Sequence, residues 1–120
     1  MAIVLVVDDD PEALEILVDV LRRANHQVET VSSGEAALAY VRAQVPDLVV
    51  MDLKLPGING IQALRAMKAI VPDVRAIMVT GFLAEALVDE VWSIDPIAVL
   101  PKPVDLDHLL TLVARATTER

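Results

Sequence analysis

The chain has 120 residues, of which 55% are hydrophobic, and its formal net charge is −8. Such an acidic domain is unsuited to binding nucleic acid, because phosphate contacts need clustered lysine and arginine. Cysteine is absent, which excludes disulfides and thiolate metal sites. No apolar stretch reaches the roughly 18 residues of a membrane span, and the N-terminus has no basic signal-peptide region. We expect one cytoplasmic domain over residues 1–120, with 116–120 as a frayed end or the start of a linker.

Short apolar runs rich in Val, Ile and Leu recur along the chain, and such runs are typical of fully buried parallel strands. Five strands are expected, at Ile3–Val7, Val28–Val31, Leu48–Met51, Ala76–Val79 and Ile97–Leu100. A helical pattern follows each run. Strict alternation predicts a parallel sheet with right-handed crossovers and helices on both faces. A helical bundle would leave the short runs, bounded by proline and glycine, unexplained.

The first two helices carry start signals. Asp10 is the expected N-cap of the first helix, and Pro11 suits its first position, where no backbone N–H is needed. The spacing of Ser32 and Glu35 predicts a capping box at the start of the second helix.

The later helices are bounded in similar ways. Asn59-Gly60 begins the third helix and Pro72 ends it. A weaker apolar pattern from Leu83 to Trp92 predicts a fourth helix, and Asp105 caps the last one.

Polar residues stand where four of the expected strands end. They are Asp8 and Asp9, Asp52, Thr80 and Lys102. The carboxyl ends of parallel strands meet at one edge of a sheet, and ligands bind in the crevice there. Three carboxylates, a hydroxyl and an ammonium are therefore expected to lie together.

The carboxylates predict a metal site. Capping explains Asp10, but it does not require Asp8 and Asp9 as well, nor Asp52 on another strand. Like charges close together need compensation, by protons or by a cation. Oxygen ligands favour Mg²⁺, with Mn²⁺ as the alternative, over Zn²⁺.

The remaining polar residues favour phosphoryl transfer. Lys102 lies between two prolines that fix its backbone, and it can pair with Asp52 or with a bound anion. Thr80, beside Gly81, is placed to donate to a phosphoryl oxygen, because glycine permits close approach of the backbone. A carboxylate can attack phosphorus and form an aspartyl-phosphate.

These motifs together resemble the receiver (phosphoacceptor) domain of two-component response regulators. The resemblance covers essentially the whole chain and rests on four motifs: Val6–Asp10, Met51–Gly57 with Asn59-Gly60, Val79–Gly81 and Leu100–Pro103. It implies a flavodoxin-like (βα)5 fold whose five-stranded parallel sheet has the order 2-1-3-4-5.

The resemblance also implies roles for individual residues. Asp52 would be the phosphoacceptor, and Mg²⁺ would be bound by Asp9 and Asp52, by Asp8 through water, and by the backbone carbonyl of Lys54. Thr80 and Lys102 would contact the phosphoryl group, and a cis bond is expected between Lys102 and Pro103.

Two positions of the family pattern concern switching and phosphoryl lifetime. Val99 replaces the aromatic residue usual three positions before the lysine, so the customary coupling of that aromatic to Thr80 is in question. Lys54 and Phe82 stand at the two positions that tune loss of the phosphoryl group, and we expect Phe82 to screen the attacking water.

By the same resemblance, the phosphodonor would be a sensor histidine kinase, a phosphotransfer protein or a small acyl phosphate. The domain would catalyse its own phosphorylation and slow dephosphorylation rather than act as a conventional enzyme. It would signal through its fourth helix, fifth strand and fifth helix, a face that could also form a homodimer. The output domain or target cannot be predicted.

Two other functions compete with this interpretation. The first is a receiver that only docks or dimerises, an alternative that Val99 keeps open. The second is a phosphohydrolase of the haloacid-dehalogenase type, because Asp8-Asp9-Asp10 offers an Asp-x-Asp motif after the first strand. The late acidic pair and the cap region expected of such an enzyme are missing.

Overall fold

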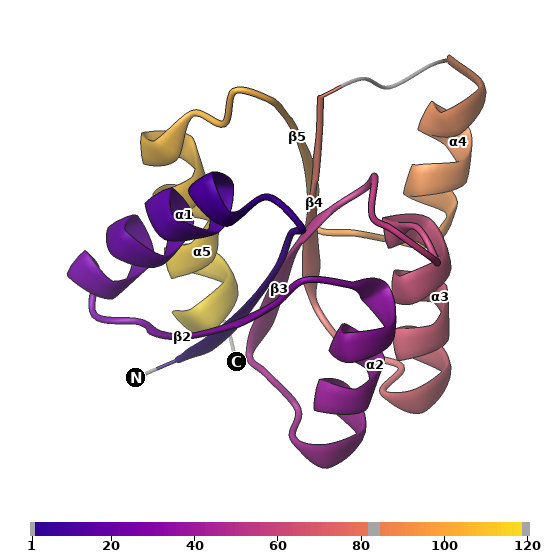
Figure 1. Ribbon diagram of the computed structural model, residues 1–120, viewed down its shortest axis with the longest axis horizontal. Coiled ribbons are helices and arrows are strands. Elements are labelled where there is room, and N and C mark those ends of the chain that lie inside the picture. The colour runs from indigo at the N-terminus through magenta and orange to yellow at the C-terminus, as the bar shows by residue number, and fades with distance from the viewer. Residues whose placement is uncertain (1, 82–84, 119–120) are drawn as a thin grey trace.

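The structure is a computed structural model that describes residues 2–81 and 85–118 (Figure 1). Its strands are β1 (Ile3–Val7), β2 (Gln27–Val31), β3 (Leu48–Asp52), β4 (Ala76–Thr80) and β5 (Ala98–Pro101). Its helices are α1 (Pro11–Arg23), α2 (Gly34–Ala43), α3 (Gly60–Ile70), α4 (Glu85–Ser93) and α5 (Leu106–Thr118). The strands are parallel in the order β2-β1-β3-β4-β5, which confirms the predicted flavodoxin-like fold.

Helices cover both faces of the sheet, and this explains why the central strands are apolar up to their last residues, Asp52 in β3 and Thr80 in β4. In β1, Val4 and Val6 belong to the core beneath α1 and α5, whereas Leu5 and Val7 belong to the core on the opposite face. Figure 1 shows α1 and α5 on one side of the sheet and α2 and α3 on the other. Successive side chains of a strand point to opposite faces, so a sheet buried on both sides needs continuous apolar strands.

The helix caps largely follow the sequence signals. The Asp10 carboxylate accepts a hydrogen bond from the Glu12 N–H at 3.0 Å, and Asp105 accepts one from the His108 N–H at 3.1 Å. Asn59 and Gln62 form a reciprocal capping box at the start of α3. Each contact satisfies a backbone donor that the first turn of a helix leaves without an intrahelical partner.

The capping box predicted for α2 is wrong. Ser33, not Ser32, is the N-cap, and its hydroxyl accepts from the Ala36 N–H at 3.1 Å. The Glu35 carboxylate instead accepts from the Ile58 N–H at 3.3 Å, in the loop between β3 and α3. Glu35 therefore accepts from a backbone N–H that is distant in the sequence, and not from the backbone N–H of Ser32 that the spacing suggested.

The last helix continues into the segment that was expected to be a frayed end or the start of a linker. Residues 116–118 belong to α5. Ala116 is buried against the core, and its carbonyl accepts a hydrogen bond from Arg75 in the segment before β4. Tertiary packing of this kind stabilises a helix end that local sequence alone would not.

Candidate functional site

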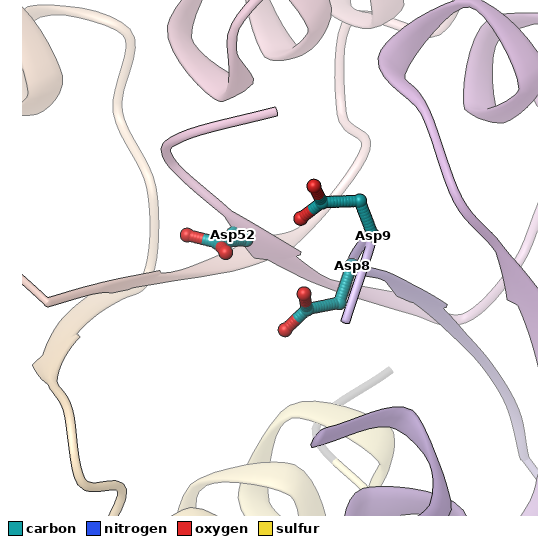
Figure 2. A group of neighbouring side chains, drawn as sticks. All are labelled: Asp8, Asp9 and Asp52. Carbon is teal, nitrogen blue, oxygen red and sulfur yellow. The ribbon is translucent and has the colours of Figure 1, made fainter. Parts of the chain in front are cut away.

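The parallel register brings the acidic residues together. Val7 pairs with Met51, so Asp8 and Asp52, the residues that follow them, are neighbours at the carboxyl edge of the sheet. Figure 2 shows the carboxylates of Asp8, Asp9 and Asp52 around one space. A ligand oxygen from each lies within 4.8 Å of the others, close enough to share a metal ion. The sequence-based expectation that these three residues meet is confirmed.

The three carboxylates differ in burial. Asp8 is 4% exposed and Asp52 is 7% exposed, whereas Asp9 is open to solvent. The Asp8 carboxylate accepts a hydrogen bond from the Asp10 N–H at 2.9 Å, and Asp52 accepts one from the Lys54 N–H at 3.2 Å. The site therefore has two carboxylates fixed by the backbone and one at its open side.

Lys102 supplies positive charge to this cluster. Its Nζ lies 2.8 Å from Asp52 Oδ2 and 3.8 Å from Asp8 Oδ2, and its side chain is 34% exposed. Its backbone N–H donates to the Thr80 carbonyl at 2.8 Å, which fixes the residue where β5 ends. The peptide bond to Pro103 is cis, as expected. The two contacts of its Nζ place the ammonium at the acidic edge of the sheet.

The electrostatics of the site shift two pKa values. Burial raises the pKa of Asp8 above its ordinary value, and the nearby Asp52 and Asp9 add to this effect, although the Asp10 N–H and Lys102 oppose it. Burial by itself would lower the pKa of Lys102. The hydrogen bond to Asp52 and the attraction of Asp52, Asp8 and Asp10 outweigh that burial and raise it. The site as a whole favours bound positive charge.

Close packing holds the β3–α3 loop at this edge. A Cβ atom at Gly60 would lie 2.5 Å from the Asp52 carbonyl oxygen and 2.9 Å from the Leu53 Cα, so only glycine fits there. Gly57 has a φ of +73°, a conformation that favours glycine, and a Cβ at this position would collide with Glu35. Glu35 and Gly60 therefore hold the loop that supports the acidic site. This supporting role of the two residues was not predicted from the sequence.

Of the other expected site residues, Thr80 and Gly81 lie at the same edge of the sheet, whereas Val99 lies within β5, opposite Met78. Thr80 is 7% exposed at the end of β4. A Cβ at Gly81 would lie 3.8 Å from Lys102 Cδ, which is an ordinary van der Waals contact. Val99 is half-buried and packs against the core on the α2–α3 face. Phe82 lies outside the described residues.

Comparison with known proteins identifies the family. The sequence profile of the response regulator receiver domain matches residues 4–114. The chain belongs to this family. This receiver is 30% identical to sporulation initiation phosphotransferase F of Bacillus subtilis, over 93% of this chain and 90% of that protein. It is 37% identical to protein PilH of Pseudomonas aeruginosa, over 94% of this chain and 95% of that protein.

A solved structure supports the same assignment. The receiver superimposes on a CheY-like receiver domain protein from Methanospirillum hungatei with a TM-score of 0.94 and 26% identity, covering 99% of this chain and 95% of that one. It is also 34% identical to the transcriptional regulatory protein ZraR of Escherichia coli, but spans only 26% of that protein.

Among residues 2–81 and 85–118, none of the helices is long and apolar enough to cross a membrane.

Proposed function

We propose that this receiver domain accepts a phosphoryl group on Asp52 in a reaction that depends on Mg²⁺. The observation that carries the proposal is the convergence of Asp8, Asp9 and Asp52 within 4.8 Å, with the Lys102 ammonium 2.8 Å from Asp52. The donor would be a sensor histidine kinase, a phosphotransfer protein or a small acyl phosphate. Membership of the receiver family supports this class of partner.

The donor set fits a hard divalent cation. Asp9 and Asp52 would bind Mg²⁺ directly, and Asp8 would bind it through water. The Lys54 carbonyl would complete the protein ligands, and Mn²⁺ would serve as a substitute. All of these ligands are oxygens, as Mg²⁺ prefers, and the exposure of Asp9 leaves room for water in the coordination shell. Bound there, the ion would neutralise charge on the phosphoryl oxygens.

The residues of the chain would divide the chemistry between them. An oxygen of the Asp52 carboxylate attacks phosphorus, and the bond from phosphorus to the leaving group breaks. Lys102 then exchanges its pairing with Asp52 for one with the phosphoryl group, and Thr80 donates its hydroxyl to a phosphoryl oxygen. The two residues end adjacent strands and are tied by the hydrogen bond from the Lys102 N–H to the Thr80 carbonyl, so they would respond together.

The signal would leave the site through α4, β5 and α5. The movement of Lys102 acts directly on β5, and Val99 lies in the same strand. Because Val99 has no large side chain to rotate, we expect a displacement of the strand and of α4 rather than a swing between two rotamers. Gly81 and Pro103 flank the moving groups, and Phe82 would limit access of water to the phosphoryl group.

The docking-only receiver remains the second candidate. Its support is Val99, which lacks the aromatic ring usual at this position in the family. The paired Lys102 and the complete acidic set favour phosphorylation instead.

Intact-protein mass spectrometry with acetyl phosphate tests the proposal. We expect one labile phosphoryl adduct. It should form only with Mg²⁺, should not form when EDTA is present from the start, and should be absent in Asp52→Asn. Asp73→Asn, a change at an exposed carboxylate, is the matched control and should label normally. If wild type is labelled neither by acetyl phosphate nor by its kinase, the docking-only function is favoured. Sustained turnover that survives Asp52→Asn but not Asp8→Asn would indicate a phosphohydrolase.

A further inference from the structure

A groove of about 400 Å³ opens directly beside the proposed phosphoacceptor. It lies between α1 and the segment that joins β5 to α5, and its polar end is formed by Asp8, Asp52 and Lys102. Its volume is within the range of about 300–1,000 Å³ that is usual for small-molecule pockets. The attacking carboxylate therefore faces a cavity much larger than a phosphoryl group requires.

Beyond this polar end, most of the residues that line the groove are apolar. Val50 and Val79 lie on its sheet side, Ile16 comes from α1, and Val104 and Leu106 come from the opposite wall. Ile16 is 54% exposed although it is a large apolar residue on a helix, and it lines the groove. An apolar wall continuous with a phosphoryl-accepting end suits a ligand that is charged at one end and hydrophobic at the other.

We propose that this groove holds the acyl chain of small acyl phosphate donors, so that donors with neutral apolar chains of about four carbons outperform acetyl phosphate. The inference rests on the proposed function of Asp52. An oxygen of Asp52 forms the new bond to phosphorus, and the bond between phosphorus and the acyl oxygen breaks. The products are the aspartyl-phosphate and a free carboxylate anion, with no net change in protons.

The charges of the groove sharpen this specificity. Asp10 and Glu12 also line it, and Lys102 is the one cation among the described residues that line it. A second carboxylate on the acyl chain would meet these acidic side chains without a partner. We therefore expect an uncharged alkyl chain to be accepted and an acyl chain ending in a carboxylate to be rejected.

The experiment compares donors that differ only in their acyl group. Rate constants for phosphorylation of Asp52 by acetyl phosphate and butyryl phosphate are measured by intact-protein mass at equal donor concentration. Acetate and butyrate are leaving groups of nearly equal basicity, so the two donors are matched in intrinsic reactivity at phosphorus. Partial burial of two additional methylenes should make the butyryl rate about fivefold higher. Ile16→Gln should abolish most of this advantage. Val45→Gln changes an apolar residue of nearly equal exposure, 53%, that is outside the groove, and should retain it.

Three results would overturn the inference. Equal rates for the two donors would show that the groove does not bind the acyl chain, while the phosphoacceptor role of Asp52 would stand. An advantage that survives Ile16→Gln would place the chain elsewhere. If phosphoramidate, which has no acyl group, labels Asp52 but neither acyl phosphate does, the inference fails and the proposed function of Asp52 stands.

Discussion

The Lys102 ammonium lies 2.8 Å from Asp52 Oδ2, across the gap between the ends of β5 and β3. The strand between them, β4, holds the lysine in place through the Thr80 carbonyl. The negative charge of Asp52, the carboxylate that we propose to attack phosphorus, is therefore paired with an ammonium in the resting domain. Release of this lysine is the event that would connect the chemistry to β5.

Removal of the lysine should destabilise the metal-free domain. Asp52 is 7% exposed, and in Lys102→Met it would keep a buried charge near Asp8 without its cation. We expect the free energy of unfolding in EDTA to fall by about 3 kcal/mol, the lower part of the range for breaking a buried pair. Urea titration measures this loss, and Mg²⁺ should recover part of it. Arg23→Met, which removes an exposed ion pair to Asp19, should cost less than about 1 kcal/mol.

Asp9→Asn should separate metal binding from folding. Asp9 is exposed, so its replacement should leave the stability in EDTA nearly unchanged. Wild type should gain about 1.4 kcal/mol in Mg²⁺ at ten times its dissociation constant, because the ion binds only the folded state. Asp9→Asn should lose most of this gain at the same Mg²⁺ concentration. Glu15→Gln, an exposed change on α1, should keep it; an equal gain in Asp9→Asn would contradict the proposed ligand set.

Gly60→Ala should damage both the fold and the site. The added Cβ would lie 2.5 Å from the Asp52 carbonyl oxygen, so the β3–α3 loop must shift. We expect a loss of about 1–3 kcal/mol in the free energy of unfolding, together with slower labelling of Asp52. Gly81→Ala is the matched control for stability, because among residues 2–81 and 85–118 its Cβ would meet only the Lys102 side chain, at 3.8 Å. Equal losses for the two variants would show that crowding at Gly60 is not the cause.

Tyr40→Phe should be neutral or stabilising. The Tyr40 hydroxyl oxygen is buried, and no described residue is its hydrogen-bond partner. Removing a buried hydroxyl that lacks a partner should stabilise the domain by up to about 1 kcal/mol. A loss of stability of similar size would indicate that the hydroxyl has a partner.

The same residue should give a pH dependence at alkaline pH. Burial, with a smaller contribution from Glu29, raises the pKa of Tyr40 above 10.0, so the folded state keeps its proton after the unfolded state has lost it. The contribution of Tyr40 to stability should therefore be constant well below pH 10 and be lost as the pH rises through the unfolded-state pKa toward the folded-state value. Tyr40→Phe should reduce this loss, which chemical denaturation at several pH values would measure.

The sequence predicted the sheet and the acidic site because both depend on local patterns. Five apolar runs separated by helical patterns specify parallel strands, and a polar residue after a strand must lie at the carboxyl edge. Asp52 and Thr80 were expected just after their strands and instead are the last residues of β3 and β4. The difference is one residue and leaves both side chains at that edge.

The supporting contacts could not be predicted in this way. Glu35 accepts from the N–H of Ile58, 23 residues away, and its spacing to Ser32 suggested a local partner instead. Gly60 was interpreted as a helix start and as part of a family motif, but its close packing against the Asp52 carbonyl oxygen was not predicted. Contacts of this kind depend on how the loop and helices pack, which local periodicity does not encode.

The two outer strands also influence how the molecule behaves at high concentration. β2 and β5 are five and four residues long, β2 carries the exposed Glu29, and β5 ends at Pro101, which has no N–H to donate. Short edge strands that carry charge or proline are poor templates for pairing with another chain. The concentrated protein should therefore resist forming fibrillar aggregates even when heat partly unfolds it for a short time.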